Sequence, residues 1–143
     1  MVERFFHISP WDTTTWTPRG SPKFICIALG TNDEAKDVAP DLFRLTLERF
    51  IRRLSITFPS VTVFYVVPPF RDFNEADVGA IHGDLVSRPV TVDDLLINVC
   101  NGINSEMTLE HTVDGLHPTL EGHAVLAKSL AHFLAPQIRK YLI

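Results

Sequence analysis

Disulfide pairs, long apolar runs and an excess of basic charge are all missing from this sequence. Its 143 residues include only two cysteines, Cys26 and Cys100, which are too few for a disulfide framework. No apolar stretch approaches the roughly 20 residues of a membrane-spanning helix, and the opening MVERFFHISP contains no secretory apolar region. Thirteen Lys and Arg against seventeen Asp and Glu give a net charge of −4. We therefore expect no nucleic-acid partner and no membrane partner. As written, the chain is expected to be cytoplasmic, a location left open if the N-terminus is truncated.

The rest of the composition is that of one folded domain. Hydrophobic residues make up 45% of the chain, which suffices for one core but not for two domains. HISPWDTTTWTPRGSP predicts that residues 1–22 form an irregular segment ahead of a domain at 23–143. Trp11 and Trp16 are expected to cover apolar surface there rather than to bind a sugar. Cys26, inside the apolar run FICIAL, is expected to be buried.

Two strands and an intervening helix are predicted by the apolar pattern. KFICIALG at 23–30 is apolar on both faces, as central parallel strands are, and SVTVFYVVPP at 60–69 is rich in β-branched residues. Between them, Pro40 suits a first helical turn. Strand, helix and strand in this order predict an α/β protein with a parallel sheet. Two apolar sets recur at helical spacing, either Leu42, Leu45 and Phe50 or Phe43, Leu47, Ile51 and Leu54.

The remaining elements are less sharply defined by the sequence. A third strand is expected at Val90–Asp93 or at Leu96–Val99, after a long loop at 68–88 that has room for a helical turn. A final helix is expected to start at Pro118 and to be interrupted at Pro136. One stripe of that helix contains Leu120, Ala124, Ala127, Ala131 and Leu134.

Two polar clusters lie near strand ends or helix starts, where ligands gather in parallel α/β proteins. GTND at 30–33 follows the first strand, and Asn32 in it offers a neutral amide donor. DGLHPTLEGH begins at Asp114, three residues before His117. In a turn, such a carboxylate can accept a hydrogen bond from Nδ1–H of the imidazole and leave Nε2 free as a base. Pro118 biases His117 away from the α region, which keeps the histidine in the loop.

Each cluster also has a purely structural interpretation. Asp-Gly is a common turn, a histidine before a proline can cap a helix, and GTND can be a simple turn after a strand. A metal site built from His111, Asp114, His117 and His123 is a weaker alternative, because His123 lies inside the predicted helix. We therefore expect no metal and no cofactor.

Together, ALGTND and DGLHPTLEGH resemble the third and fifth conserved blocks of the SGNH, or GDSL-type, hydrolases. The resemblance implies an esterase or acetylesterase on a three-layer α/β/α flavodoxin-like fold. It implies that Asn32 is an oxyanion-hole donor and that Asp114 and His117 belong to a Ser-His-Asp triad. The segment PWDTTTWTPRGSPKFICIALGTND is also similar, more weakly, to carbohydrate acetylesterases of that superfamily.

A small ester is the substrate that this resemblance implies. Gly30 and Thr31 of the GTND block are expected to contact it. Arg71, which follows the second strand, is a further candidate for lining the pocket, although a surface ion pair with Asp72 would also explain it.

The chain departs from the family at its first two blocks. The Gly-Asp-Ser block that contributes the nucleophile is missing, as is the second block with its oxyanion glycine. Only 22 residues precede Lys23, too few for two strands and two helices. None of the seven serines stands in a strand, Gly-Asp-Ser, helix setting. We therefore expect an incomplete sheet of about three strands, and weak or no activity from the isolated chain.

The missing strands leave FICIAL at an edge of the sheet, with unpaired backbone groups. The N-terminal segment, a second copy of the chain, or a complementing chain that supplies the serine could cover this edge. Two functions remain open at this point. One is an SGNH-type ester hydrolase with the base and the oxyanion donor but no nucleophile of its own. The other is a catalytically inactive domain that serves as a binding or interaction surface.

Overall fold

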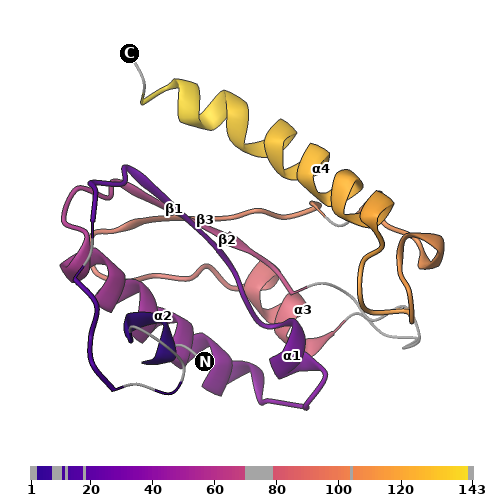
Figure 1. The fold of residues 1–143 in the computed structure, drawn as a ribbon, viewed down its shortest axis with the longest axis horizontal. Coiled ribbons are helices and arrows are strands. Elements are labelled where there is room, and N and C mark those ends of the chain that lie inside the picture. The colour runs from indigo at the N-terminus through magenta and orange to yellow at the C-terminus, as the bar shows by residue number, and fades with distance from the viewer. Residues whose placement is uncertain are drawn as a thin grey trace.

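The computed structural model describes residues 3–7, 11, 13–17, 19–69, 79–103 and 105–141. Three short strands form a parallel sheet in the order β1-β2-β3, with helices on both of its faces (Figure 1). This is the expected α/β class with three strands. The elements in chain order are η1 (Glu3–Phe6), β1 (Phe24–Ala28), α1 (Thr31–Glu34), α2 (Pro40–Thr57), β2 (Val63–Val67), α3 (Ala80–Ser87), β3 (Leu96–Val99), η2 (Leu109–His111) and α4 (Leu120–Arg139).

The larger core lies between the sheet and the layer formed by α2 and α3 (Figure 1). Of the two apolar sets in α2, the one containing Phe43 and Leu47 is buried, whereas Leu42 and Leu45 are exposed. The buried set recurs every three to four residues, so it forms one stripe that faces the sheet. Phe50 joins this stripe, and Phe6 of the N-terminal segment packs against its ring.

The described residues of the N-terminal segment include some regular structure. The segment contains the helix η1, and His7 pairs with Thr15 in an isolated antiparallel bridge. Trp16 packs beside Phe58 and donates its indole N–H to the carbonyl of Phe5, so its predicted covering role is confirmed. The same prediction for Trp11 is wrong, because that side chain is 90% exposed.

The third strand is β3, so the second of the two expected positions, Leu96–Val99, is confirmed. It pairs with β2 in parallel, with Val63 opposite Leu96. Val90 and Val92 are also apolar and buried, but they lie in an irregular stretch before a turn in which Asp93 has a positive φ of 47°. Burial at alternate positions therefore occurs here without strand pairing.

In the described part of the chain, helix α4 packs on the second face of the sheet (Figure 1). It starts at Leu120 rather than Pro118, because Thr119 caps it by accepting the N–H of Gly122. It also runs through Pro136, which lies in the last turn, where a missing N–H removes a single helical bond.

The stripe of α4 that packs on the sheet differs from the predicted one. Leu126, Leu130 and Phe133 contact the sheet, whereas Leu120 and the predicted alanines are exposed. Leu134 is the one member of the predicted stripe that joins this packing. The larger side chains reach the sheet from the helix, so they set its orientation.

Within the described part of the chain, β1 pairs only with β2 and is therefore an edge strand, as expected. The expectation that Cys26 is buried is wrong. Cys26 and Ala28 are exposed on the α4 side of β1, where the packing against α4 centres on β2 and includes Phe24 of β1 but neither of these two residues. Cys100, by contrast, is fully buried, and burial raises the pKa of its thiol to about 12.

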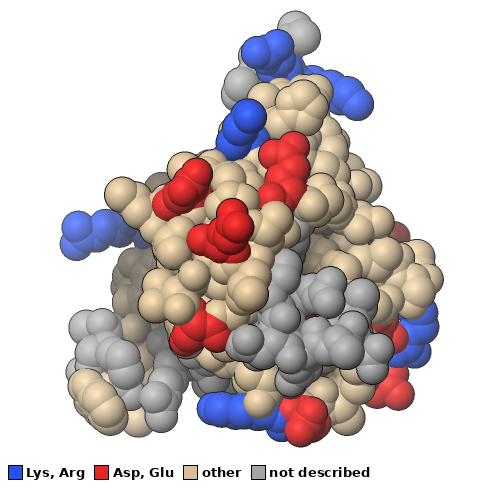
Figure 2. All heavy atoms as spheres, turned by 90° about the vertical axis from the view of Figure 1, so that its right-hand side faces the viewer, with Lys and Arg blue, Asp and Glu red and all other residues tan. Residues whose placement is uncertain are grey.

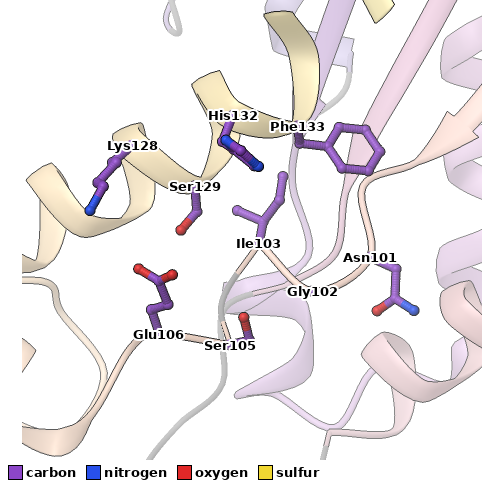
Figure 3. A pocket seen from close by; sticks show the side chains of 9 residues that line it. All are labelled: Asn101, Gly102, Ile103, Ser105, Glu106, Lys128, Ser129, His132 and Phe133. Carbon is purple, nitrogen blue, oxygen red and sulfur yellow. The ribbon is translucent and has the colours of Figure 1, made fainter. Parts of the chain in front are cut away.

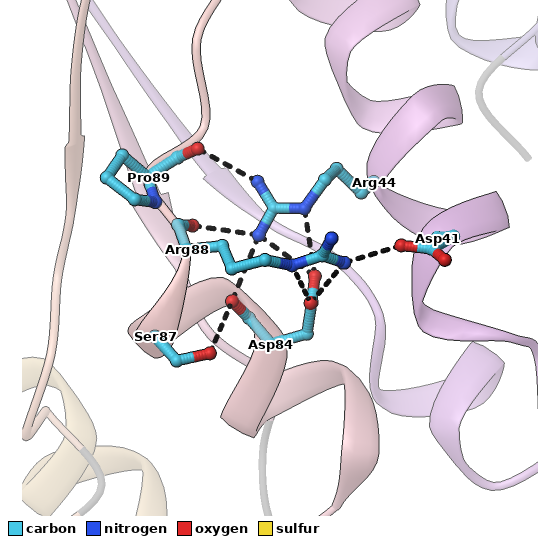
Figure 4. Close-up of polar contacts among 6 residues, drawn as sticks. All are labelled: Asp41, Arg44, Asp84, Ser87, Arg88 and Pro89. Carbon is cyan, nitrogen blue, oxygen red and sulfur yellow. Dashed lines mark hydrogen bonds and ion pairs between the residues drawn. The ribbon is translucent and has the colours of Figure 1, made fainter.

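An ionic cluster fastens α3 to α2 (Figure 4). Arg44 of α2 donates to the carboxylate of Asp84 at 2.9 Å and to the carbonyl oxygens of Asp84, Arg88 and Pro89 at 2.8–3.0 Å. Those carbonyls include the end of α3, so the guanidinium acts as a C-terminal cap supplied by another helix. Arg88 adds ion pairs to Asp84 and Asp41 at the exposed rim. No helix in the described ranges combines the length and apolar character needed to cross a bilayer.

Candidate functional site

Asp114 and His117 contact each other, as their spacing predicts. Oδ2 of Asp114 lies 2.7 Å from Nδ1 of His117. Oδ1 accepts the backbone N–H groups of His117 at 2.8 Å and of Leu116 at 3.0 Å. The backbone N–H of His117, its ring and the N–H of Leu116 together hold the pKa of the Asp114 carboxyl at about 2. The carboxylate is therefore charged throughout the neutral range.

The loop around this pair is closed by its own hydrogen bonds. Val113 donates its N–H to the carbonyl of His117 at 2.8 Å, and Thr112 forms an antiparallel bridge with Pro118. Gly115, at a positive φ of 91°, donates its N–H to the hydroxyl of Thr112 at 3.0 Å. A residue with a side chain would be strained at that φ, which explains the glycine in DGLH. The loop thus positions the carboxylate and the imidazole before any ligand binds.

The imidazole of His117 is available to solvent. Its side chain is 71% exposed, and within the described residues Nε2 has no hydrogen-bond partner. Ser9 lies outside the described residues, and none of the other six serines bonds to His117. The described part of the chain therefore contains an oriented histidine but no serine beside it.

The GTND block forms the turn from β1 into the short helix α1. Gly30 adopts a φ of 115°, and a Cβ there would lie 2.7 Å from Cγ of Pro69 and 2.9 Å from Cζ of Phe43. Both the backbone angle and the close approach therefore require glycine. Asn32 is helical and exposed in α1. The turn expected at this block is thus formed by Gly30, and Asn32 presents its amide at the surface.

Glu34 is a structural residue at this end of the sheet that the sequence did not reveal. Its Oε1 accepts the backbone N–H of Ile81 at 3.1 Å, at the start of α3. The carboxylate occupies the space that a side chain would need at Gly79, where a Cβ would lie only 1.5 Å from Oε1. A negative charge at a helix N-terminus is favourable, so Glu34 ties the turn after β1 to α3.

A pocket of about 310 Å³ opens at the carboxyl ends of β1 and β2, beneath α4. Thr31 and Pro69 line it from the two strand ends, and His123 and Leu126 line it from α4. Most of its other lining is apolar. His123 was considered only as a metal ligand from the sequence, so its place in this pocket is new.

The structure places the two predicted clusters at the same end of the sheet, where α1 and the loop before α4 both lie (Figure 1). Asn32 and His117 are not among the residues that line the pocket beside Thr31. Their meeting in one cleft therefore stays a prediction. Arg71, the remaining predicted substrate contact, lies outside the described residues.

Metal binding finds no support among the described residues, where no three His, Cys, Asp or Glu side chains lie close enough together to hold an ion. His111 has a different use. Its Nδ1 accepts the backbone N–H of Thr108 at 3.0 Å and completes a capping box around η2.

The observations that bear on function are the geometry of the loop around Asp114 and His117 and the two sequence motifs, GTND and DGLH. Protein-family models, curated proteins and solved structures yield no match to this chain.

Proposed function

We propose that this chain contributes the general-base half of an ester-hydrolase active site, as its resemblance to the SGNH hydrolases implies. The observation that supports this most is the 2.7 Å contact between Asp114 and His117. With Nδ1–H donated to the carboxylate, the lone pair of the neutral ring is at Nε2, which faces solvent. That nitrogen can accept a proton from a hydroxyl group or from water.

The charge of Asp114 assists the proton transfer. As His117 takes up a proton, the ring becomes an imidazolium, and the carboxylate next to it stabilises that positive charge. Because the pKa of Asp114 is held at about 2, the carboxyl group does not itself take the proton at neutral pH. In the proposed mechanism Asn32 donates its amide N–H to the oxyanion, and Gly30 and Thr31 lie beside the acyl group.

A small neutral ester is the substrate class that we propose. The pocket beside Thr31 is mainly apolar and of a size for a short acyl chain such as acetyl. Residues 106–121 include Glu106, Glu110, Asp114 and Glu121 and contain no Lys or Arg. Figure 2 shows acidic side chains on the upper part of this end of the molecule, with most basic ones near the outline. Such a surface disfavours phosphate esters and other anions, and is compatible with acetyl groups on a carbohydrate.

The nucleophile in this proposal comes from outside the described residues. A complementing chain that adds a strand to the edge of β1 would bring a serine to the carboxyl end of the sheet, next to Gly30. Without such a chain, the proposed nucleophile is water activated by His117, so the isolated chain should be slow. Loss of the nucleophile in a well-studied serine protease costs about 10⁶ in rate.

Hydrolysis of p-nitrophenyl acetate by the purified chain tests this proposal. We expect slow turnover that falls to the level of free imidazole in His117→Ala and is strongly reduced in Asp114→Asn. Histidines can hydrolyse this ester unspecifically, so His7→Ala, in the N-terminal segment, is the matched control and should leave the rate unchanged. Equal rates in the wild type and in His117→Ala, with native circular dichroism spectra, would refute the proposal.

An interaction domain without catalysis is the second candidate. The edge of β1, together with the exposed Cys26 and Ala28 on its α4 side, is the observation that favours it. A self-associating chain would show a concentration-dependent mass by sedimentation. Absence of turnover combined with such self-association would favour this candidate over the hydrolase.

A further inference from the structure

A cavity of about 440 Å³ lies between the loop that follows β3 and the middle of α4 (Figure 3). Its volume is within the range of small-molecule sites, and it lies beyond the carboxyl end of β3, where parallel sheets collect their ligands. It shares only Ile103 with the pocket beside Thr31, so the two are separate spaces on either side of that residue.

Charges of both signs face this cavity. Lys128 and His132 come from α4, one turn apart on the same side of the helix, and Glu106 comes from the opposite loop. In the described part of the chain, neither Lys128 nor Glu106 has a hydrogen-bond or ion-pair partner. Figure 3 shows Lys128, Ser129 and Glu106 together at one end, with the hydroxyl of Ser129 directed toward the side of Glu106. A ligand at that end can therefore meet a cation, an anion and a hydroxyl group at once.

The apolar part of the cavity lies beside this charged end. Ile103 is buried, with 4% exposure, and the half-buried Phe133 follows it toward the sheet (Figure 3). Ile103 is already covered, whereas Phe133 keeps part of its surface exposed, so an apolar group that packs against Phe133 would remove that surface from water, which favours binding. The cavity is thus divided into a doubly charged end and an apolar floor.

We infer that this cavity binds a small α-amino acid with an apolar side chain. Such a ligand has an ammonium and a carboxylate on the same carbon, so Glu106 and Lys128 can each meet an opposite charge at one end. Its side chain then lies toward Phe133, beside Ile103. Glu106 and Lys128 are both exposed, so a ligand with a single charge forms one ion pair where an amino acid forms two, and it binds more weakly.

Amide chemical shifts measured by NMR during titration with L-leucine test the inference. We expect saturable shifts centred on Ile103, Lys128 and Ser129. N-acetyl-L-leucine keeps only the carboxylate and 3-methylbutylamine only the ammonium. Each should bind roughly 10- to 100-fold more weakly, which corresponds to one lost hydrogen bond to a charged group.

Variants identify the residues responsible. Glu106→Gln and Lys128→Met should each weaken leucine binding by at least about tenfold. Lys36→Met and Glu48→Gln, in other parts of the fold, should have no effect. His117→Ala should also bind leucine normally, because His117 does not line this cavity. The outcome of the leucine titration therefore does not depend on the hydrolase proposal. Absence of saturable shifts at millimolar leucine, equal binding of N-acetyl-L-leucine, or unchanged binding by both cavity variants would overturn it.

Discussion

The space in which Gly122 would hold a side chain is occupied by the carbonyl oxygen of His111, which would lie 2.2 Å from a Cβ at that position. This oxygen is fixed, because it accepts the N–H of Thr119 at 2.9 Å and its hydroxyl at 3.2 Å. The first turn of α4 therefore lies directly against η2. The loop that holds Asp114 and His117 connects these two elements, so its position depends on this close approach.

We predict that Gly122→Ala destabilises the protein by about 1–3 kcal/mol, because relief of the clash must break the bonds to His111. Alanine is otherwise the better helix former by about 1 kcal/mol. Gly83→Ala in α3 is the matched control, since a Cβ there meets nothing within 4 Å. That control should stabilise by about 0.5–1 kcal/mol. Urea unfolding measures both changes in the free energy of unfolding. A stabilising Gly122→Ala would show that α4 does not pack closely against η2.

The pKa of Asp114 provides a second prediction. This pKa lies at about 2, below the ordinary 3.8, because the folded turn favours the charged carboxylate. The charged carboxylate therefore stabilises the folded turn above about pH 4, and this stabilisation is lost as the pH falls toward 2. In His117→Ala this pKa should rise but stay below 3.8, because the backbone N–H groups of residues 116 and 117 still donate to the carboxylate. Carboxyl ¹³C shifts followed from pH 5 to pH 1.5 measure it. A wild-type midpoint near 3.8 would contradict the observed geometry.

Removal of the largely covered guanidinium of Arg44, whose side chain is 11% exposed, should be far more costly than removal of an exposed one. Arg44→Met leaves Asp84 and three carbonyl oxygens without this donor, and we expect a loss of about 2–4 kcal/mol. Arg52 pairs with Asp93 at 2.7 Å, but both side chains are more than half exposed. Arg52→Met should therefore cost at most about 1 kcal/mol. Similar losses in thermal unfolding of the two variants would show that the cluster in Figure 4 does not stabilise α3.

Local features of the structure were predictable from the sequence, because local spacing determines them. The contact between Asp114 and His117 spans three residues, and the turn at Gly30 follows directly from an apolar strand. The runs that form β1 and β2 contain β-branched and aromatic residues that favour strands wherever they pack.

Features that depend on distant partners could not be predicted in this way. The burial of Val90 and Val92 resembles that of a strand, but whether a segment pairs depends on its neighbour in the sheet. Cys26 is exposed because the packing against α4 centres on β2 and does not reach this part of β1, which no pattern within FICIAL indicates. The contact between Glu34 and Ile81 joins residues 47 positions apart, so neither segment alone reveals it.

The tautomer of His117 is the most direct test of the central claim, that Asp114 holds this ring as a base with Nε2 free. Long-range ¹H–¹⁵N spectra at alkaline pH, where imidazoles are neutral, distinguish the two nitrogens. We predict that the proton of His117 is on Nδ1 in the wild type and that Asp114→Asn shifts it at least in part to Nε2. A proton on Nε2 in the wild type, or a tautomer unchanged by Asp114→Asn, would contradict the account.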